Sequence, residues 1–120
     1  MANLLVVEDD EDLRDLLVTE LEDMGHKVVT ACNGEEGLRR ASAQPPDLIL
    51  SDINMPKMNG YQFRRQLTNA HPHLGKLPFI FVSAYADDTD IADGLITGAS
   101  HYVTKPIDFR ALEGWIKTLL

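Results

Sequence analysis

The sequence has a single cysteine, few basic residues and no long apolar run, and each shortage excludes a class of protein. Cys32 has no second cysteine with which to form an internal disulfide. No apolar stretch approaches the roughly 20 residues that span a bilayer, and the chain does not open on a basic segment followed by an apolar one, as a secretory signal does. We therefore expect a cytoplasmic protein without a membrane segment.

The charge balance is strongly acidic. The chain contains 11 Lys and Arg against 19 Asp and Glu, which gives a formal net charge of -8. This balance argues against a nucleic-acid or anionic membrane surface and favours a metal or a cationic ligand. The 120 residues can form one domain with its own hydrophobic core, and they contain neither repeats nor low-complexity segments. We expect a single domain over residues 1–120.

Hydrophobic patterning predicts five strands alternating with five helices. Short apolar or β-branched runs predict strands over residues 3–7, 27–31, 48–52, 77–82 and 101–104. Apolar residues at helical spacing predict a first helix of about 14 residues that ends at Gly25, and further helices over 34–41, 61–69, 87–96 and 108–120. Right-handed crossovers then favour a three-layer doubly wound (flavodoxin-like) α/β fold with a parallel sheet. The strand order that we expect in such a sheet is 2-1-3-4-5.

One carboxylate has a special place in this arrangement. Asp52 ends the apolar run 48–51, and Asn54, Pro56 and Gly60 then lead the chain into a loop. Asp52 is therefore expected at the carboxyl end of a strand, where parallel α/β sheets collect their ligands. Taken alone, this residue could equally be an aspartate that caps its own turn.

Four other residues are expected at the same edge of the sheet. Glu8 and Asp9 follow the strand beside that of Asp52, and three carboxylates in one pocket require a cation or raised pKa values. Carboxylate oxygens, a backbone carbonyl and waters are the ligands of Mg²⁺. Ser83 ends the fourth strand and Lys105 follows the fifth, adding a hydroxyl and an ammonium. Together these groups predict a phosphoryl-transfer pocket in which Asp52 becomes an aspartyl phosphate.

These residues resemble the receiver domain of the response regulators of two-component signalling, over essentially the whole chain. The resemblance rests on the acidic pair Glu8-Asp9, the loop Asp52-Ile53-Asn54-Met55-Pro56-Lys57-Met58-Asn59-Gly60, the segment Val82-Ser83-Ala84 and the pair Lys105-Pro106. It implies that Asp9, Asp52 and the backbone carbonyl of Asn54 hold Mg²⁺ or Mn²⁺, and that Glu8 reaches the ion through water. It also implies that Lys105 contacts the phosphoryl group and that the Lys105–Pro106 bond is cis.

The same resemblance implies a signalling switch rather than an enzyme, with only self-phosphorylation and slow autodephosphorylation. The phosphoryl donor would be a phosphohistidine on a sensor histidine kinase or phosphotransfer protein. Ser83 would move toward the phosphate and Tyr102 would turn inward, which would change the face formed by the helix over 87–96, the strand over 101–104 and the last helix. That face would contact an output domain or target protein, or a second copy in a homodimer. Asn54 and Tyr85 resemble the pair that sets phosphate lifetime, and a bulky Tyr85 would slow the attacking water.

Three other functions are compatible with parts of the pattern. An aspartate-nucleophile phosphatase or phosphotransferase needs a second acid two residues after the nucleophile, and Asn54 stands there. A nucleotide- or flavin-binding module of the same strand order would need a glycine-rich phosphate loop, which the sequence lacks. A receiver-like domain that only binds a partner is disfavoured because every pocket residue is present.

Several further residues have simpler interpretations. Asp10 precedes the first helix and is expected to be its N-cap rather than a metal ligand. His71 and His73 lie in a loop without a third ligand, so we assign them no site. Trp115 is expected in the core or in an interface, and Cys32 is expected to be a small apolar filler.

Overall fold

A five-stranded parallel sheet forms the centre of the computed structural model, which describes residues 2–83 and 101–120. Its strands lie in the order β2-β1-β3-β4-β5, so the predicted order is confirmed. The strands are β1 (Asn3–Val7), β2 (Lys27–Ala31), β3 (Leu48–Asp52), β4 (Phe79–Ser83) and β5 (His101–Thr104). The most apolar runs, β1, β3 and β4, occupy the middle of the sheet, where all their residues except Asn3 are buried.

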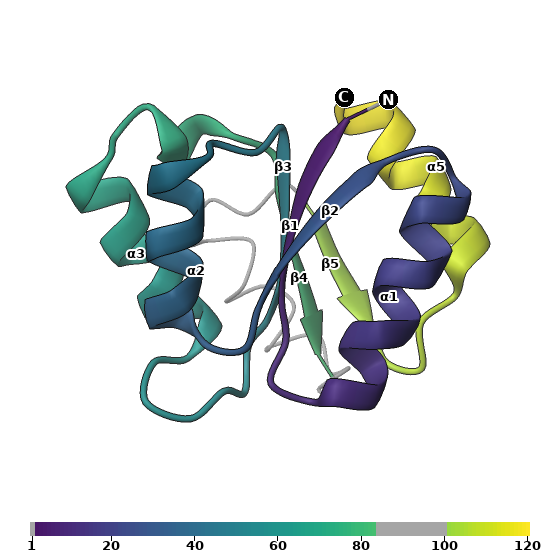
Figure 1. Ribbon diagram of the computed structural model, residues 1–120, viewed down its shortest axis with the longest axis horizontal. Coiled ribbons are helices and arrows are strands. Elements are labelled where there is room, and N and C mark those ends of the chain that lie inside the picture. Colours follow the sequence, from purple (N-terminus) through teal and green to yellow (C-terminus); the bar gives the residue numbers. More distant parts are fainter. Residues whose placement is uncertain (1, 84–100) are drawn as a thin grey trace.

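Helices cover both faces of this sheet (Figure 1). The helices α2 (Gly34–Ala43) and α3 (Gly60–Ala70) lie on one face, and α1 (Glu11–Asp23) and α5 (Phe109–Leu119) lie on the other. A short 3₁₀ helix over Leu74–Lys76, which the sequence pattern did not indicate, precedes β4. The helix predicted over 87–96 lies outside the described residues, so four of the five predicted helices are observed.

Each of the four helices begins at a residue whose side chain accepts backbone hydrogen bonds. Asp10 accepts from the N–H groups of Asp12 and Leu13, which confirms that it is the N-cap of α1. The other N-caps are Asn33 before α2, Asn59 before α3 and Asp108 before α5. These short polar residues fix where each strand-to-helix loop ends.

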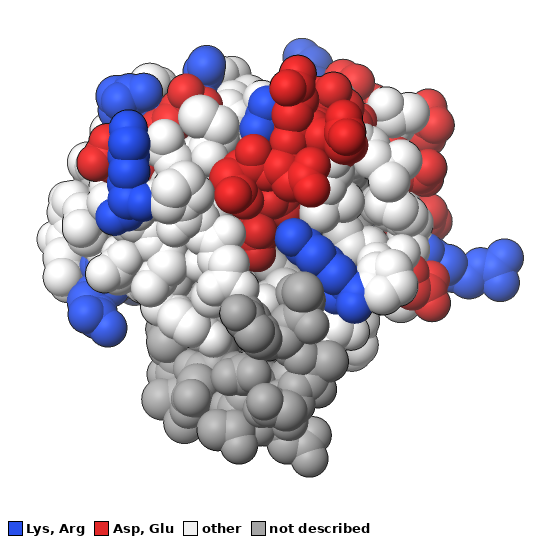
Figure 2. All heavy atoms as spheres, turned by 90° about the horizontal axis from the view of Figure 1, so that it is seen from below, with Lys and Arg blue, Asp and Glu red and all other residues white. Residues whose placement is uncertain are grey.

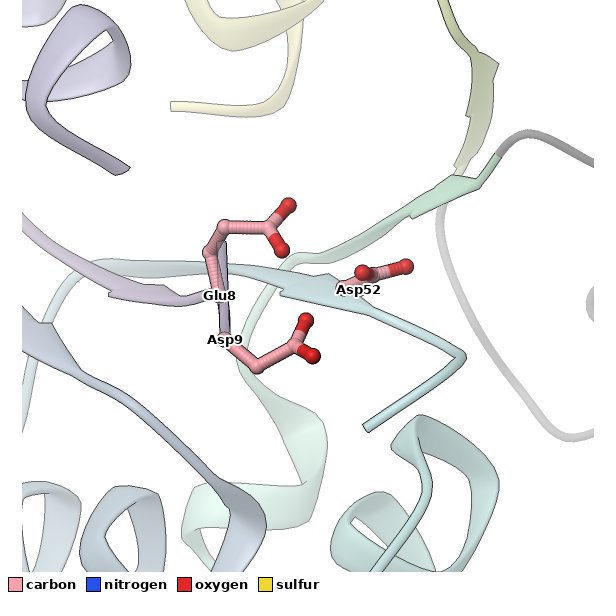
Figure 3. A group of neighbouring side chains, drawn as sticks. All are labelled: Glu8, Asp9 and Asp52. Carbon is pink, nitrogen blue, oxygen red and sulfur yellow. The ribbon is translucent and has the colours of Figure 1, made fainter. Parts of the chain in front are cut away.

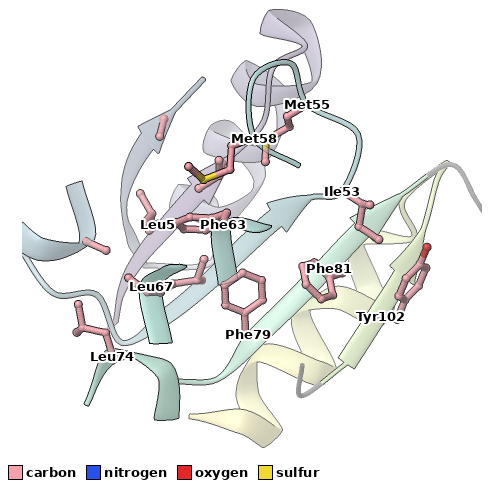
Figure 4. Packing of buried hydrophobic residues seen from close by; sticks show 14 residues of the cluster. Leu5, Ile53, Met55, Met58, Phe63, Leu67, Leu74, Phe79, Phe81 and Tyr102 are labelled. Carbon is pink, nitrogen blue, oxygen red and sulfur yellow. The ribbon is translucent and has the colours of Figure 1, made fainter. Parts of the chain in front are cut away.

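The hydrophobic core has two halves, one on each side of the sheet. Alternate residues of a strand point to opposite faces, so neighbours such as Leu4 and Leu5 belong to different halves. The α2 and α3 side is rich in aromatic residues (Figure 4). Its large buried side chains include Leu5, Ile49, Phe63, Leu67, Phe79 and Phe81, whereas the α1 and α5 side includes Leu4, Leu17, Leu21, Leu50, Ile80, Leu112 and Ile116. Both faces of the sheet are therefore covered by packed apolar side chains.

The environment of Cys32 differs from the sequence-based expectation, and that of Trp115 excludes one of the two places expected for it. Cys32 is exposed immediately after β2, so its interpretation as an apolar filler was wrong. Trp115 is 40% exposed on α5, which excludes the core, whereas its place in an interface stays a prediction. Helical spacing indicates the direction in which a residue faces but not how far the neighbouring layer extends over it. In the part of the chain that the structure describes, no helix is long and apolar enough to cross a membrane.

Candidate functional site

The predicted site residues meet at the carboxyl edge of the sheet. Glu8 and Asp9 follow β1, and Asp52 is the last residue of β3, which is paired with β1. The three carboxylates face one another (Figure 3) and each offers an oxygen within 4.8 Å of the others. Viewed onto this edge, the molecule shows a continuous acidic surface with a basic side chain beside it (Figure 2). The parallel arrangement thus brings together acids that lie more than forty positions apart in the sequence.

Asp52 is held in a fixed orientation. Its side chain is only 5% exposed, and its Oδ1 accepts hydrogen bonds from the backbone N–H groups of Ile53 at 2.7 Å and Asn54 at 3.3 Å. Its other oxygen, Oδ2, lies 3.2 Å from the Nζ of Lys105. One oxygen is therefore fixed by the loop that follows β3, and the other faces the Lys105 ammonium.

Lys105 links the two buried acids. Its Nζ lies 3.1 Å from Glu8 Oε1 as well as 3.2 Å from Asp52 Oδ2. Burial alone would lower the pKa of Lys105, but the Asp52 and Glu8 carboxylates raise it above its ordinary value, so the ammonium stays charged. The Lys105 N–H donates to the Ser83 carbonyl at 2.8 Å, which places the lysine beside the end of β4. The peptide bond to Pro106 is cis, as expected.

Glu8 is the most deeply buried acid of the site, with 1% of its surface exposed. Its Oε2 accepts the N–H of Asp10 at 3.1 Å. Burial, together with the nearby Asp52 carboxylate, raises the pKa of Glu8 from 4.5 to about 7. The buried Glu8 carboxyl therefore gives up its proton less readily than an exposed glutamate does.

Gly60 provides a contact that the sequence did not reveal. A Cβ at this position would lie 2.4 Å from the Asp52 carbonyl oxygen and 2.9 Å from the Ile53 Cα, so only glycine fits. The Gly60 N–H donates to the Ile53 carbonyl at 2.9 Å, which closes the loop back onto the end of β3. Within the loop, Lys57 adopts a left-handed conformation with φ of 69°. The start of α3 thus packs directly on the backbone of Asp52.

The other predicted residues are placed as follows. Ser83 is buried at the end of β4, one residue after Val82, the sheet partner of Asp52. Tyr102 pairs with Phe81 across β4 and β5 and is buried in the core half that contains α2 and α3. Asn54 is exposed in the loop after β3. Tyr85 lies outside the described residues.

The histidine pair does not extend to a third ligand. His71 is half-buried and His73 is exposed, and their ring centroids lie 6.0 Å apart. Over residues 2–83 and 101–120, the group of three or more side chains suited to a metal is the acidic one, Glu8, Asp9 and Asp52. Nothing in the described structure adds the third ligand that a site at the two histidines would need.

The structure therefore defines a doubly wound α/β protein with three acids and a lysine at the carboxyl edge of its sheet. The chain belongs to the response regulator receiver domain family, whose sequence model matches residues 4–117. The described fold and the arrangement of Glu8, Asp9, Asp52 and Lys105 agree with this membership.

Related proteins differ in length. The chain is 38% identical to the transcriptional regulatory protein AfsQ1 of Streptomyces coelicolor, over 100% of this chain and 52% of that protein. It is also 38% identical to the protein PilH of Pseudomonas aeruginosa, of which it covers 98%. The chain therefore spans about half the length of the transcriptional regulators it matches. Among solved structures, the chemotaxis protein CheY4 of Vibrio cholerae matches with a TM-score of 0.92 and 28% identity, over 100% of this chain and 99% of that one.

Proposed function

We propose that this receiver domain is a phosphorylation-dependent switch whose phosphoacceptor is Asp52. The observation that carries the proposal is the environment of the Asp52 carboxylate, with one oxygen fixed by two amides and the other 3.2 Å from the Lys105 ammonium. The donor is a phosphohistidine of a sensor histidine kinase or phosphotransfer protein, as is general for this family.

The transfer needs little beyond positioning and charge neutralisation. An Asp52 oxygen attacks phosphorus, the phosphorus–nitrogen bond of the donor breaks, and the leaving imidazole keeps the bonding electron pair and takes up a proton. Lys105 then leaves its ion pair with Asp52 to neutralise the phosphoryl oxygens. The buried Glu8 keeps the ammonium near the site throughout, because Lys105 is paired with it as well.

The acidic cluster fits a divalent cation. Its three carboxylate donors lie within 4.8 Å of one another, and carboxylate oxygens are the ligands that Mg²⁺ prefers. Asp9, Asp52 and the Asn54 carbonyl would hold Mg²⁺ or Mn²⁺, with Glu8 acting through water. The bound cation would offset the charge of the incoming phosphoryl oxygens.

The output follows from the neighbours of the site. Ser83 would turn its hydroxyl toward the phosphoryl group, and Tyr102, on the strand beside it, would keep the buried position that it already has. Phosphorylation adds about -1.5 to -2 charges, and one charge-assisted hydrogen bond of roughly 1.5 to 3 kcal/mol is sufficient to shift a two-state segment. The face that includes β5 and α5 would then change its contact with an output domain, a target protein or a second copy. Asn54 and Tyr85 would set the phosphate lifetime.

A switch fits the site better than a phosphatase does. A phosphatase needs an acid two residues after the nucleophile to protonate the leaving group, and Asn54 cannot supply that proton. We therefore propose that the chain does not turn over phosphomonoesters and dephosphorylates only itself, slowly. We also propose that it acts in the cytoplasm without contacting nucleic acid directly.

Intact mass measurement tests the phosphoacceptor. The protein is incubated with Mg²⁺ and acetyl phosphate, and one phosphoryl adduct is expected on the wild type and none on Asp52→Asn. Asp15→Asn, which removes a carboxylate from the exposed surface of α1, is the matched control and should form the adduct normally. No adduct on folded wild-type protein, or an equal adduct on Asp52→Asn, contradicts the proposal.

A further inference from the structure

Arg14 forms an unusual link between α1 and the acidic segment. Its Nη1 donates a 2.9 Å hydrogen bond to the backbone carbonyl of Glu8, six residues earlier in the chain. Arg14 lies in the second turn of α1, and its own N–H donates to the Asp10 carbonyl. Because Asp10 is the N-cap, the helix that carries Arg14 starts from a fixed point.

The hydrogen bond from Arg14 lies just beyond the end of β1. The registers of β1 with β2 and β3 both end at Val7, and the N–H of Glu8 still donates to the Ala31 carbonyl at 3.0 Å. The next backbone group is the Glu8 carbonyl, and Arg14 is its donor. Arg14 thus continues the fixation of the backbone by one peptide unit beyond the sheet.

That peptide unit determines how Asp9 is presented. The Glu8 carbonyl and the Asp9 N–H belong to one planar group, so fixing the oxygen also fixes the direction in which the chain enters Asp9. The Glu8 carboxylate is held separately, by Lys105 and by the N–H of Asp10. Asp9 is exposed, and its carboxylate reaches the cluster from a backbone that Arg14 orients.

We propose that Arg14 is a positioning residue of the phosphoacceptor site: it fixes the peptide plane between Glu8 and Asp9 and so holds the acidic pair in place for a divalent cation. This inference rests on the function proposed above. Arg14 contacts the backbone carbonyl of Glu8, so it acts through the backbone of the two acids and not on the reacting atoms. Partners that orient metal ligands in this way typically change metal affinity by about 10- to 100-fold when they are removed.

The charge of Arg14 makes the test decisive. Removing a positive charge near three carboxylates should, by itself, strengthen the binding of a cation. A loss of Mg²⁺ affinity on removal of Arg14 therefore reports the lost hydrogen bond, because the electrostatic effect has the opposite sign. Loss of the hydrogen bond predicts a higher Mg²⁺ Kd, whereas loss of the positive charge alone predicts a lower one.

The experiment compares Arg14→Met, Arg14→Lys and Arg39→Met with the wild type by calorimetric titration with Mg²⁺. Arg14→Met keeps an unbranched apolar side chain and loses the donor, and its Mg²⁺ Kd is expected to rise about tenfold. Arg14→Lys keeps the charge with a single flexible donor, so its Mg²⁺ Kd should lie between those of the wild type and Arg14→Met. Arg39, which is 73% exposed on α2, is the control of equal charge change, and its variant should keep the wild-type Kd.

Phosphorylation by acetyl phosphate gives an independent measurement. The Arg14→Met rate should be reduced at limiting Mg²⁺ and should recover to within about twofold at saturating Mg²⁺, since positioning of the acids mainly affects cation binding. An unchanged or tighter Kd in Arg14→Met or in Arg14→Lys overturns the role of Arg14. Absence of Mg²⁺ binding or of an Asp52 adduct in the wild type would instead overturn the proposed function and this inference with it.

Discussion

The Lys105 ammonium lies 3.2 Å from Asp52 Oδ2, although the two residues are 53 positions apart in the chain. The adjacent strands β3, β4 and β5 bring them together, because β4 lies between the strand that ends at Asp52 and the strand that precedes Lys105. The same ammonium lies 3.1 Å from Glu8. One lysine thus holds two buried carboxylates near each other, and its removal should affect cation binding and phosphoryl transfer in opposite ways.

Replacing Lys105 with Met should slow phosphorylation and strengthen Mg²⁺ binding. Without the ammonium the phosphoryl oxygens lose a charged partner, and the rate with acetyl phosphate should fall about a hundredfold. The carboxylates lose a competing cation, so the Mg²⁺ Kd should decrease by roughly three- to tenfold. Lys117→Met, which removes an exposed lysine paired with Glu113 on α5, is the control and should change neither quantity. Weaker Mg²⁺ binding in Lys105→Met would contradict the expected competition.

Asp10 should contribute to stability without holding the metal. Asp10→Ala removes the acceptor for the N–H groups of Asp12 and Leu13, and the free energy of unfolding should fall by about 1 kcal/mol in urea denaturation. Asp10→Ser removes the same charge but keeps a capping oxygen, so it should retain most of that stability. Both variants should bind Mg²⁺ with the same Kd as the wild type. A large loss of Mg²⁺ affinity in both would show that Asp10 is a ligand.

Gly60 and Gly114 should respond to alanine in opposite directions. At Gly60 the added Cβ would meet the Asp52 backbone at 2.4 Å, and a collision with backbone cannot be relieved by a side-chain rotation. Gly60→Ala should lower the free energy of unfolding by about 1 to 3 kcal/mol and slow phosphorylation by displacing Asp52. Gly114 lies within α5 and a Cβ there meets nothing within 4 Å, so Gly114→Ala should raise stability by about 0.5 to 1 kcal/mol. Equal effects at the two positions in urea denaturation would contradict this explanation.

The sequence was sufficient to predict the sheet and the residues that meet at its edge. Apolar runs marked β1, β3 and β4 as central strands, and each of these runs ends at or just before a polar residue of the site. With the expected strand order 2-1-3-4-5, the strands before Glu8 and Asp52 are neighbours, so the proximity of Glu8, Asp9 and Asp52 followed. Short-range patterns therefore determined this part of the site, because parallel strands present their carboxyl ends at one edge.

Contacts that depend on side-chain reach could not be predicted in this way. The Arg14 bond to the Glu8 carbonyl and the packing of Gly60 on Asp52 depend on how loops and helices settle against the sheet. Neither produces a periodic signal. Leu16 shows that spacing can also predict too much burial. It belongs to the apolar pattern that includes Leu13 and Leu17, but it is 45% exposed on α1. Periodicity defines a face, whereas burial depends on what covers it.

The contact between His101 and Trp115 should make the fluorescence of the protein sensitive to pH. The centroids of the two rings lie 3.8 Å apart, and Trp115 is the only tryptophan of the chain. Burial lowers the pKa of His101 from 6.5, so the imidazole should become charged only below pH 6.5. A charged imidazole quenches a neighbouring indole more strongly than a neutral one. Emission from Trp115 should therefore decrease as the pH falls, with a midpoint below 6.5.

The lowered pKa of His101 also makes the free energy of unfolding depend on pH. A histidine whose pKa is lower in the folded than in the unfolded state takes up its proton preferentially on unfolding, so its contribution is present above pH 6.5 and is lost as the pH falls through the folded pKa. Urea denaturation at pH 7 and pH 5 should show a larger loss of stability in the wild type than in His101→Gln, whose side chain does not titrate. The fluorescence change should also be absent from His101→Gln. A midpoint above 6.5, or an unchanged transition in the variant, would show that burial does not control this histidine.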